Sequence, residues 1–243
     1  MASYLYAVVT ADSTLPQGLT GLGSAPLGIV RHHDLAAVVS QVDADEPLGG
    51  RAHVLAHGEV LRALVEHGAT VLPVRFGAVF DDDTQVADIA LAEREQDLTE
   101  VLDGLDGRCQ LTLRARYDES AVLAEVVEEN RAIAELRDLT RGRPEETTYH
   151  HRVRLGELVA QALEDKRQAD GQTLIDALAP HSVACSVLAG AGVDHLAELA
   201  FLVDRDLVGE FEESAEALAA SMAPRASLAL VGPVAPYDFV GGE

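Results

Sequence analysis

The sequence predicts an α+β protein of two modules, each an antiparallel sheet covered by helices. Short segments rich in Val, Leu and Tyr alternate with longer segments whose apolar residues recur at helical spacing. The 243 residues, 48% of them hydrophobic, suffice to bury a core in one large or two small domains. The order of elements is loosely similar in the two halves, without a residue-level repeat. We therefore expect an N-terminal domain over residues 1–118 and a C-terminal domain over 119–243, which ends in a docking tail, residues 230–243.

The first elements are a strand, a hairpin and a helix. Tyr4–Thr10 is rich in β-formers and predicts a buried strand. Leu27–Arg31 and Leu35–Val42 predict a hairpin around the polar turn His32-His33-Asp34. After a Pro/Gly break, Arg51–His67 carries apolar residues at the spacing of an amphipathic helix.

A strand, a helix and another strand complete the first module. Val71–Phe76 predicts a strand, which Pro73 places at an edge or a bulge. The carboxylates of Asp81–Asp83 suit a helix N-terminus, and the helix that follows aligns four leucines on one face: Leu91, Leu98, Leu102 and Leu105. Residues 108–117 alternate like a half-exposed strand. This order predicts one sheet with both helices on one face.

The second half begins with helices, which are followed by strands and one further helix. We expect a helix over 120–139, a second from Glu146 to Ala169, and a short segment Gln172–Leu178 before Pro180. The remaining predicted elements are two strands, a helix and a last strand: Ser182–Ala189, His195–Asp204, Leu207–Met222 and Ala226–Val231. These segments predict a second α+β unit.

Composition and charge exclude several classes of function. The formal net charge is −23, from 41 acidic and 18 basic residues, which disfavours binding to nucleic acid and to anionic lipid membranes. The apolar runs are too short to cross a bilayer, and the N-terminus lacks the pattern of a signal peptide. Cys109 and Cys185 lie far apart in strand-like segments, so no disulfide framework is expected. We expect a cytoplasmic protein.

No group of residues predicts catalysis, a cofactor or a metal. His53 and His57 are four apart on one helix, but no third ligand is suggested by spacing, and His57 also suits a hydrogen-bonded, half-buried position. The adjacent pairs His32-His33 and His150-His151 should point their side chains apart and lie on the surface. For Asp81–Asp83, helix capping is favoured over cation binding.

Two further segments suggest packing or assembly. The chain end from Leu230 carries Pro233 and Pro236 and then aromatic residues, which gain free energy only by docking. This tail is either an intramolecular clasp or a partner surface. Arg75 interrupts an apolar strand, and it either pairs with an acid such as Asp81–Asp83 or anchors a partner or a domain interface.

Four segments resemble the gas vesicle protein GvpL/GvpF family. They are the opening YLYAVV, the passage from His67 to Phe80 that contains LPVRFG, the stretch Leu199–Asp206 with Phe211 beyond it, and the tail GPVAPYDFV of residues 232–240. They occur in the family's order and span nearly the whole chain. LPVRFG and GPxxPYxF together are fairly specific.

The resemblance implies a tandem of ferredoxin-like modules and a non-enzymatic role in building gas vesicles. It implies an accessory or minor structural protein that acts in vesicle assembly by binding the small hydrophobic shell protein GvpA and other accessory proteins. The residues expected to shape the partner surface or to lock the domains are Pro73, Arg75, Phe76, Gly77, Pro233, Pro236 and Tyr237. The alternative is a small-molecule-binding protein or enzyme on the same scaffold, which a deep pocket gathering Arg75, a histidine and several acids would favour.

Overall fold

The chain forms two compact units in the computed structural model, which describes residues 1–44, 47–192 and 194–240. The first unit comprises Met1–Leu111, Leu202–Asp206 and the chain end from Gly232, and the second comprises Thr112–Phe201 and Leu207–Val231. Each contains an antiparallel sheet covered by helices, which confirms the predicted α+β fold class. The domain boundary at 118/119 stays a prediction.

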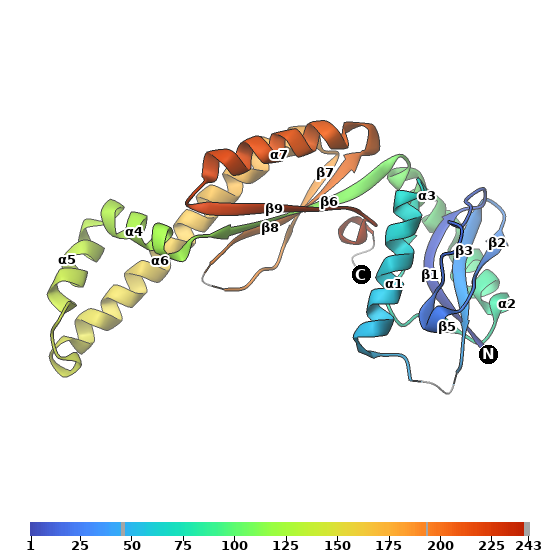
Figure 1. Ribbon diagram of the computed structural model, residues 1–243, viewed down its shortest axis with the longest axis horizontal. Helices are drawn as coiled ribbons and strands as arrows, with labels where there is room; N and C mark the ends of the chain where they lie inside the picture. The colour runs from blue at the N-terminus through green and yellow to red at the C-terminus, as the bar shows by residue number, and fades with distance from the viewer. Residues whose placement is uncertain (45–46, 193, 241–243) are drawn as a thin grey trace. The chain divides into compact units, whose positions relative to one another are not determined.

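The first unit contains a five-stranded sheet in the order β2-β3-β1-β4, with β5 also paired to β1 (Figure 1). The first strand and the β2–β3 hairpin form as predicted. Strand β4 covers only Val71–Pro73 of the predicted Val71–Phe76. The strands and helices of this unit are β1 Ala2–Thr10, η1 Leu22–Ser24, β2 Leu27–His32, β3 Leu35–Val42, α1 Gly50–Glu66, β4 Val71–Pro73, β5 Val79–Phe80, α2 Asp83–Gln85, η2 Val86–Leu91, η3 Ala92–Arg94 and α3 Glu95–Leu105.

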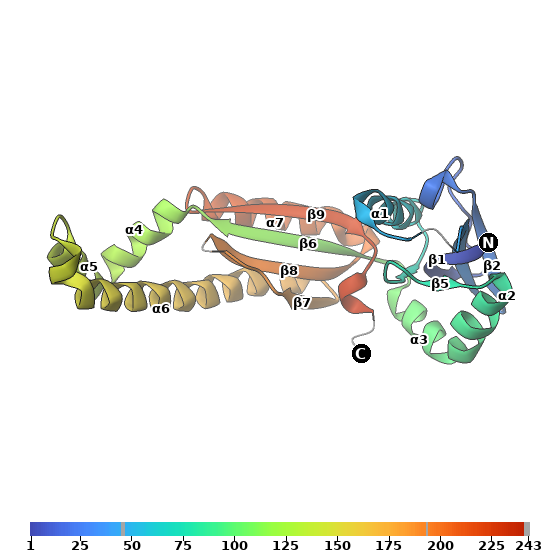
Figure 2. The same cartoon turned by 90° about the horizontal axis from the view of Figure 1, so that it is seen from below.

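Helices cover both faces of the first sheet, so the prediction of two helices on one face is wrong. Strand β1 is buried along nearly its whole length, the pattern of a strand packed on both sides. Tyr6 stacks on the ring of His57 in α1 and Tyr4 meets that ring edge-on, whereas the neighbouring Ser3 donates a hydrogen bond to Asp83 at the start of α2. Successive side chains of a strand point to opposite faces, which places α1 and α2 on opposite sides. The two views show this arrangement (Figures 1 and 2).

The predicted helix over the aligned leucines is divided into four pieces, α2, η2, η3 and α3. Asp82 caps α2 by accepting a hydrogen bond from the backbone of Gln85 at 2.9 Å, as predicted for this acidic cluster. The segment then passes through a turn of π-helix, η2, and a turn of 3-10 helix, η3, before α3. Leu91, Leu98, Leu102 and Leu105 are all buried, so the leucine pattern identified the core face correctly.

The second sheet has the strand order β7-β8-β6-β9, within the sequence of elements βαββαβ. This is the order of elements in ferredoxin-like folds, and α6 and α7 lie together on one face of it (Figure 2). Residues 108–117 pair in this sheet, whereas the sequence predicts them in the sheet with the N-terminal strands. The elements are β6 Arg108–Tyr117, α4 Glu119–Glu129, α5 Arg131–Thr140, α6 Glu145–Leu178, η4 Ala179–His181, β7 Ala184–Leu188, β8 His195–Asp204, η5 Arg205–Leu207, α7 Val208–Met222, β9 Ala226–Val234 and η6 Tyr237–Phe239.

Two helix boundaries of the second half differ from the prediction. The helix expected over 120–139 is divided at Asn130, whose side chain caps α5 by accepting hydrogen bonds from Ala132 and Ile133. The expected break after Ala169 is absent because α6 runs on unbroken to Leu178. No helix in the described part of the chain has the length and apolarity required to span a membrane.

Candidate functional site: the docked chain end

The chain end from Gly232 belongs to the first unit, where it packs against β6 and helix α1. Gly232 passes so close to β6 that a Cβ atom there would lie 2.8 Å from the carbonyl oxygen of Gln110. Its φ of +141° also disfavours any side chain. Beyond it, Ala235 and Pro236 are buried. Residues 241–243 of the predicted docking tail lie outside the described residues.

A reciprocal pair of hydrogen bonds holds the last turn. Gln110 of β6 donates from Nε2 to the carboxylate of Asp238 at 2.6 Å, and it accepts from the Asp238 backbone N–H at 3.1 Å. Gln110 is only 4% exposed, so its amide would be left without these partners if the tail detached. No local pattern could have indicated this pair, because 128 residues separate its members.

Tyr237 connects the tail to His57 of helix α1. The phenol oxygen lies 2.9 Å from His57 Nε2 and donates to the backbone carbonyl of Val74 at 3.1 Å. On the other side of the imidazole, His57 Nδ1 lies 2.8 Å from the hydroxyl of Tyr4, which accepts from the Gly77 N–H. A continuous relay of hydrogen bonds therefore runs from Gly77 through Tyr4, His57 and Tyr237 to Val74; we refer to these five residues as the tyrosine–histidine relay.

The hydrogen bonds set the tautomer of a neutral His57. Tyr237 gives its one hydrogen to the Val74 carbonyl, so it accepts from His57 Nε2–H, and on a neutral ring Nδ1 then accepts from the Tyr4 hydroxyl. Burial lowers the pKa of His57, which agrees with a neutral ring. Burial also raises the pKa of both tyrosines to about 12, which keeps both hydroxyl hydrogens in place. The sequence favours a hydrogen-bonded role for His57, and the structure places both ring nitrogens in hydrogen bonds.

The predicted site residues fall into three groups. Phe76, Gly77 and Tyr237 lie in or against the relay, with the Phe76 ring 5.8 Å from that of His57. The three prolines lie in the segments that lead into the relay. Pro73 and Pro236 are buried, and Pro233 is half-buried. Arg75 is exposed, and within the described residues it makes no ion pair with Asp81–Asp83. The roles proposed for these seven residues stay predictions.

Arg205 is a further anchor of this unit. Its guanidinium donates to the carbonyls of Val65 at 2.8 Å and Ala69 at 3.0 Å, where helix α1 ends. The last carbonyls of a helix lack intrahelical partners, and a cation there also suits the helix dipole. Only the resemblance to a family pointed to the stretch that contains Arg205; its chemistry could not be inferred from spacing.

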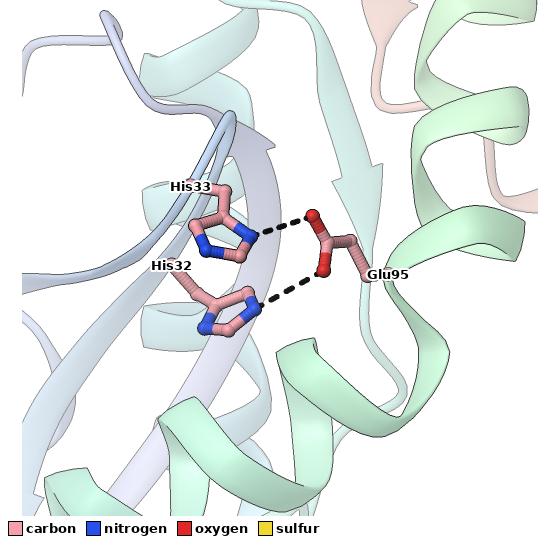
Figure 3. Close-up of side chains that lie close together, drawn as sticks. All are labelled: His32, His33 and Glu95. Atoms are coloured by element: carbon pink, nitrogen blue, oxygen red, sulfur yellow. Dashed lines mark hydrogen bonds and ion pairs between the residues drawn. The ribbon is translucent and has the colours of Figure 1, made fainter.

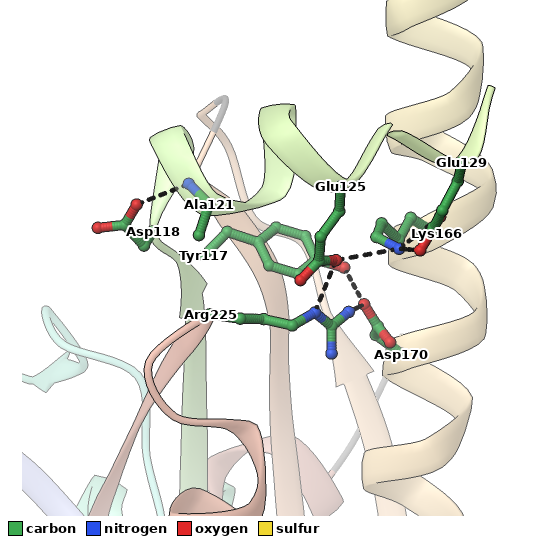
Figure 4. Close-up of polar contacts among 8 residues, drawn as sticks. All are labelled: Tyr117, Asp118, Ala121, Glu125, Glu129, Lys166, Asp170 and Arg225. Carbon is green, nitrogen blue, oxygen red and sulfur yellow. Dashed lines mark hydrogen bonds and ion pairs between the residues drawn. The ribbon is translucent and has the colours of Figure 1, made fainter. Parts of the chain in front are cut away.

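The second unit contains a polar cluster of its own (Figure 4). Arg225 pairs with Asp170 of α6 and, at 3.1 Å, with Glu125 of α4, while its guanidinium lies 5.7 Å from the centre of the Tyr117 ring. Tyr117 donates to Asp170 at 2.5 Å, and Lys166 joins Glu125 at 3.1 Å. Burial and then the bond to Asp170 raise the pKa of Tyr117. These contacts connect strands β6 and β9 to helices α4 and α6, which is a structural role.

Residues 2–241 match a protein family described as gas vesicle synthesis protein GvpL/GvpF. The chain belongs to this family. It is 33% identical to gas vesicle protein F of Streptomyces sp. (strain CB03234), over 99% of this chain and 100% of that protein. It is 31% identical to gas vesicle protein L of the same organism, over 98% of this chain and 92% of that protein. The resemblance inferred from YLYAVV, LPVRFG and the tail is therefore confirmed.

The fold of this GvpL/GvpF family member agrees with a solved structure. The crystal structure of gas vesicle protein GvpF from Anabaena sp. PCC7120 superposes with a TM-score of 0.86 at 22% identity, over 100% of this chain and 99% of that one. At this identity the match concerns the fold alone. The family and its relatives assign the protein to gas vesicles, while the partner that it contacts is a separate question.

Proposed function

We propose that this protein acts in gas vesicle assembly as a non-enzymatic accessory or minor structural component that binds the small hydrophobic shell protein and other accessory proteins. In this proposal it works in the cytoplasm and on the growing vesicle. The observation that carries the proposal is the uncharged free edge of the second sheet, strand β7.

Strand β7 has features that suit pairing with a partner strand. In the described part of the sheet its only neighbour is β8, so its outer backbone groups are free for another strand. Natural edge strands are commonly protected by lysine, proline or other charges. Residues 182–189 contain none of these, although 24% of the chain is charged. Val187 is 68% exposed and Val183 is 47% exposed, which favours an apolar partner.

A groove adjoins this edge within the second unit. It lies between helix α6 and the strands β7 and β8, and its lining includes Ile175, Val187 and Leu188. Arg167 and Glu164 contribute polar atoms to the same groove. A strand added to β7 would place alternate side chains toward this groove, since successive residues point to opposite faces. Main-chain hydrogen bonds along β7 would then provide affinity for the partner strand, and the groove would select its side chains.

The proposal is tested by co-expression with the shell protein and pull-down. We expect the wild type to retain shell protein in the soluble fraction and Val187→Lys to retain about tenfold less or lower, because the charge would be buried by an added strand. Val54→Lys is the matched control: Val54 is also exposed, at 52%, but lies on helix α1 of the first unit. Equal retention by Val187→Lys and the wild type would refute binding at β7.

A second comparison distinguishes the two roles of the tail. We propose that Phe76, Gly77, Pro236 and Tyr237 act as an intramolecular clasp, and that the exposed Arg75 contacts a partner. A chain truncated after Val231 should then lose stability, whereas Arg75→Ala should keep stability and lose retention of shell protein. Loss of binding by the truncated chain without loss of stability would favour the tail as a partner surface.

The alternative of an enzyme has less support. The feature expected of it was a pocket gathering Arg75, a histidine and several acids. In the described part of the chain His57 lies among tyrosines, and Arg75 is exposed outside the relay. His57 is thus engaged in hydrogen bonds to Tyr4 and Tyr237, and Arg75 does not join it in a pocket of the described residues.

A further inference from the structure

His32 and His33 both face the carboxylate of Glu95 (Figure 3). His32 Nε2 lies 3.2 Å from one carboxylate oxygen, and His33 Nδ1 lies 2.8 Å from the other. The three donor atoms all lie within 4.8 Å of one another. His32 is the last residue of β2, His33 lies in the turn that leads to β3, and Glu95 is the first residue of α3, so three potential ligands from two distant segments converge.

The backbone of the turn explains why adjacent histidines point the same way. Neighbouring side chains of an extended strand diverge, which is why the sequence predicted a divergent surface pair. His33, however, has a φ of +48°, in the left-handed region that few residues other than glycine adopt. This conformation brings the two rings to a centroid separation of 4.2 Å on the same side.

We propose that His32, His33 and Glu95 form a binding site for a divalent transition-metal ion of the Zn²⁺ type. Two imidazoles and a carboxylate are ligands that Zn²⁺ and its neighbours Co²⁺, Ni²⁺ and Cu²⁺ accept, whereas Ca²⁺ and Mg²⁺ prefer oxygen ligands alone. The formal net charge of −23 adds a general attraction for cations. This proposal is independent of the shell-protein proposal.

The donor positions suit a tetrahedral ion after a small adjustment. Bonds of about 2.0–2.1 Å to Zn²⁺ place adjacent tetrahedral ligands about 3.3 Å apart. The distances of 3.2 Å from His32 to one Glu95 oxygen and 2.8 Å from His33 to the other are close to this separation. A rotation of the Glu95 carboxylate would present one oxygen to the ion, and the His33 side chain, which is 68% exposed, is free to turn its ring toward the same point. Three protein ligands leave a fourth position for water or for a donor from another molecule. A bound ion would cross-link the β2–β3 turn to helix α3.

The test is metal titration of the tag-free protein. We expect calorimetry with Zn²⁺ to give one site and Co²⁺ to produce the visible absorption of a tetrahedral complex. His33→Ala and Glu95→Gln should each weaken binding by roughly tenfold or more, since each removes a ligand. A readout independent of the titration is thermal unfolding: Zn²⁺ should raise the Tm of the wild type and not that of Glu95→Gln.

The chain provides its own matched control in the pair His150-His151. These histidines are adjacent and exposed on helix α6, so His150→Ala/His151→Ala tests adventitious binding by any surface pair. This double variant should bind Zn²⁺ like the wild type. The proposal is overturned if the wild type binds no ion at 100-fold excess, if Glu95→Gln and His33→Ala bind as tightly as the wild type, or if the His150/His151 variant abolishes binding.

Discussion

His57 is the residue on which the docking of the chain end depends. It is 4% exposed, and both ring nitrogens are engaged by tyrosine hydroxyls from opposite ends of the sequence. A buried polar group costs stability only when its partners are removed. Both tyrosines hydrogen-bond to His57, but removing their hydroxyl groups should cost different amounts of stability. Tyr4 is fully buried, whereas Tyr237 is 41% exposed.

Replacing each tyrosine by phenylalanine tests this difference. Tyr4→Phe leaves Nδ1 of the buried His57 without its partner and also removes the acceptor of the Gly77 N–H, and we expect a loss of about 2–3 kcal/mol in the free energy of unfolding. Tyr237→Phe should cost about 1 kcal/mol, because water reaches the exposed site and replaces the hydroxyl. Urea denaturation measures both. Tyr149→Phe, at an exposed position of α6, is the control and should be neutral; a Tyr4→Phe cost as small as this control would contradict the relay.

The pH dependence of stability follows from the same residue. Burial lowers the pKa of His57 in the folded protein below its ordinary value of 6.5, so the unfolded chain binds the proton more readily. The contribution of neutral His57 is fully present above about pH 6.5. It is lost as the pH falls from there through the folded pKa. We expect the free energy of unfolding to fall over this window.

A comparison of variants isolates the contribution of His57. His57→Gln removes the titrating group, so the decline below pH 6.5 should be shallower than in the wild type when chemical denaturation is repeated at each pH. His150→Gln removes an exposed histidine of α6 and should leave the slope unchanged. An identical slope in the wild type and His57→Gln would show that His57 is not the group responsible.

At the scale of elements, the cluster around Arg225 holds helices α4 and α6 to the second sheet. The side chains of Arg225, Asp170 and Glu125 are 26%, 17% and 29% exposed, so the ion pairs are partly desolvated. Removing one partner of a fully buried pair costs about 3–5 kcal/mol, and solvent screening reduces that figure here. We expect Arg225→Met to cost about 2 kcal/mol and Arg225→Lys about half as much, by chemical denaturation.

The control is an exposed ion pair of the same unit. Arg131 pairs with Glu135 one turn along α5, and its side chain is 92% exposed. Arg131→Met should cost no more than about 0.5 kcal/mol, as such surface pairs do. If Arg225→Met and Arg131→Met cost the same, the cluster contributes no more than an ordinary surface pair.

Elements whose pattern is local were predictable from the sequence. Strand β1, the β2–β3 hairpin and helix α7 each have an apolar period or turn signal within a few residues. The prolines and aromatics of the tail also marked it as a docking segment, and its role stays a prediction. The division of one predicted helix at Asn130 was detectable in principle, because Asn is a favoured N-cap residue.

Features that depend on distant partners were not predictable. Nothing within β6 indicates which sheet it joins, because pairing with β8 and β9 is set by segments about a hundred residues away. Helix α6 continues past the expected break because Leu163, Leu174 and Leu178 recur at helical spacing and are all buried, which offsets the cost of Gly171. The relay joins residues up to 180 positions apart.

At the scale of the whole molecule, the dominant property is the excess of acidic groups. With 41 acidic and 18 basic residues, most carboxylates have no basic residue to pair with. A net charge this far from zero keeps a protein soluble but destabilises the folded state by self-repulsion. Many of the ion pairs that oppose this repulsion, such as Arg62–Glu59 and Arg154–Glu157, are exposed to solvent and each contributes little to stability.

Salt should therefore stabilise this protein. Raising the ionic strength from about 0.01 M to about 0.15 M shortens the Debye length from about 30 Å to about 8 Å. Repulsion between separated carboxylates is then screened, while the short ion pairs lose less because their partners are in contact. We expect the Tm in differential scanning calorimetry to rise over this range. Choline chloride and sodium chloride should act alike, because screening depends on ionic strength and not on the cation. A Tm that falls with salt would mean that the ion pairs outweigh the repulsion.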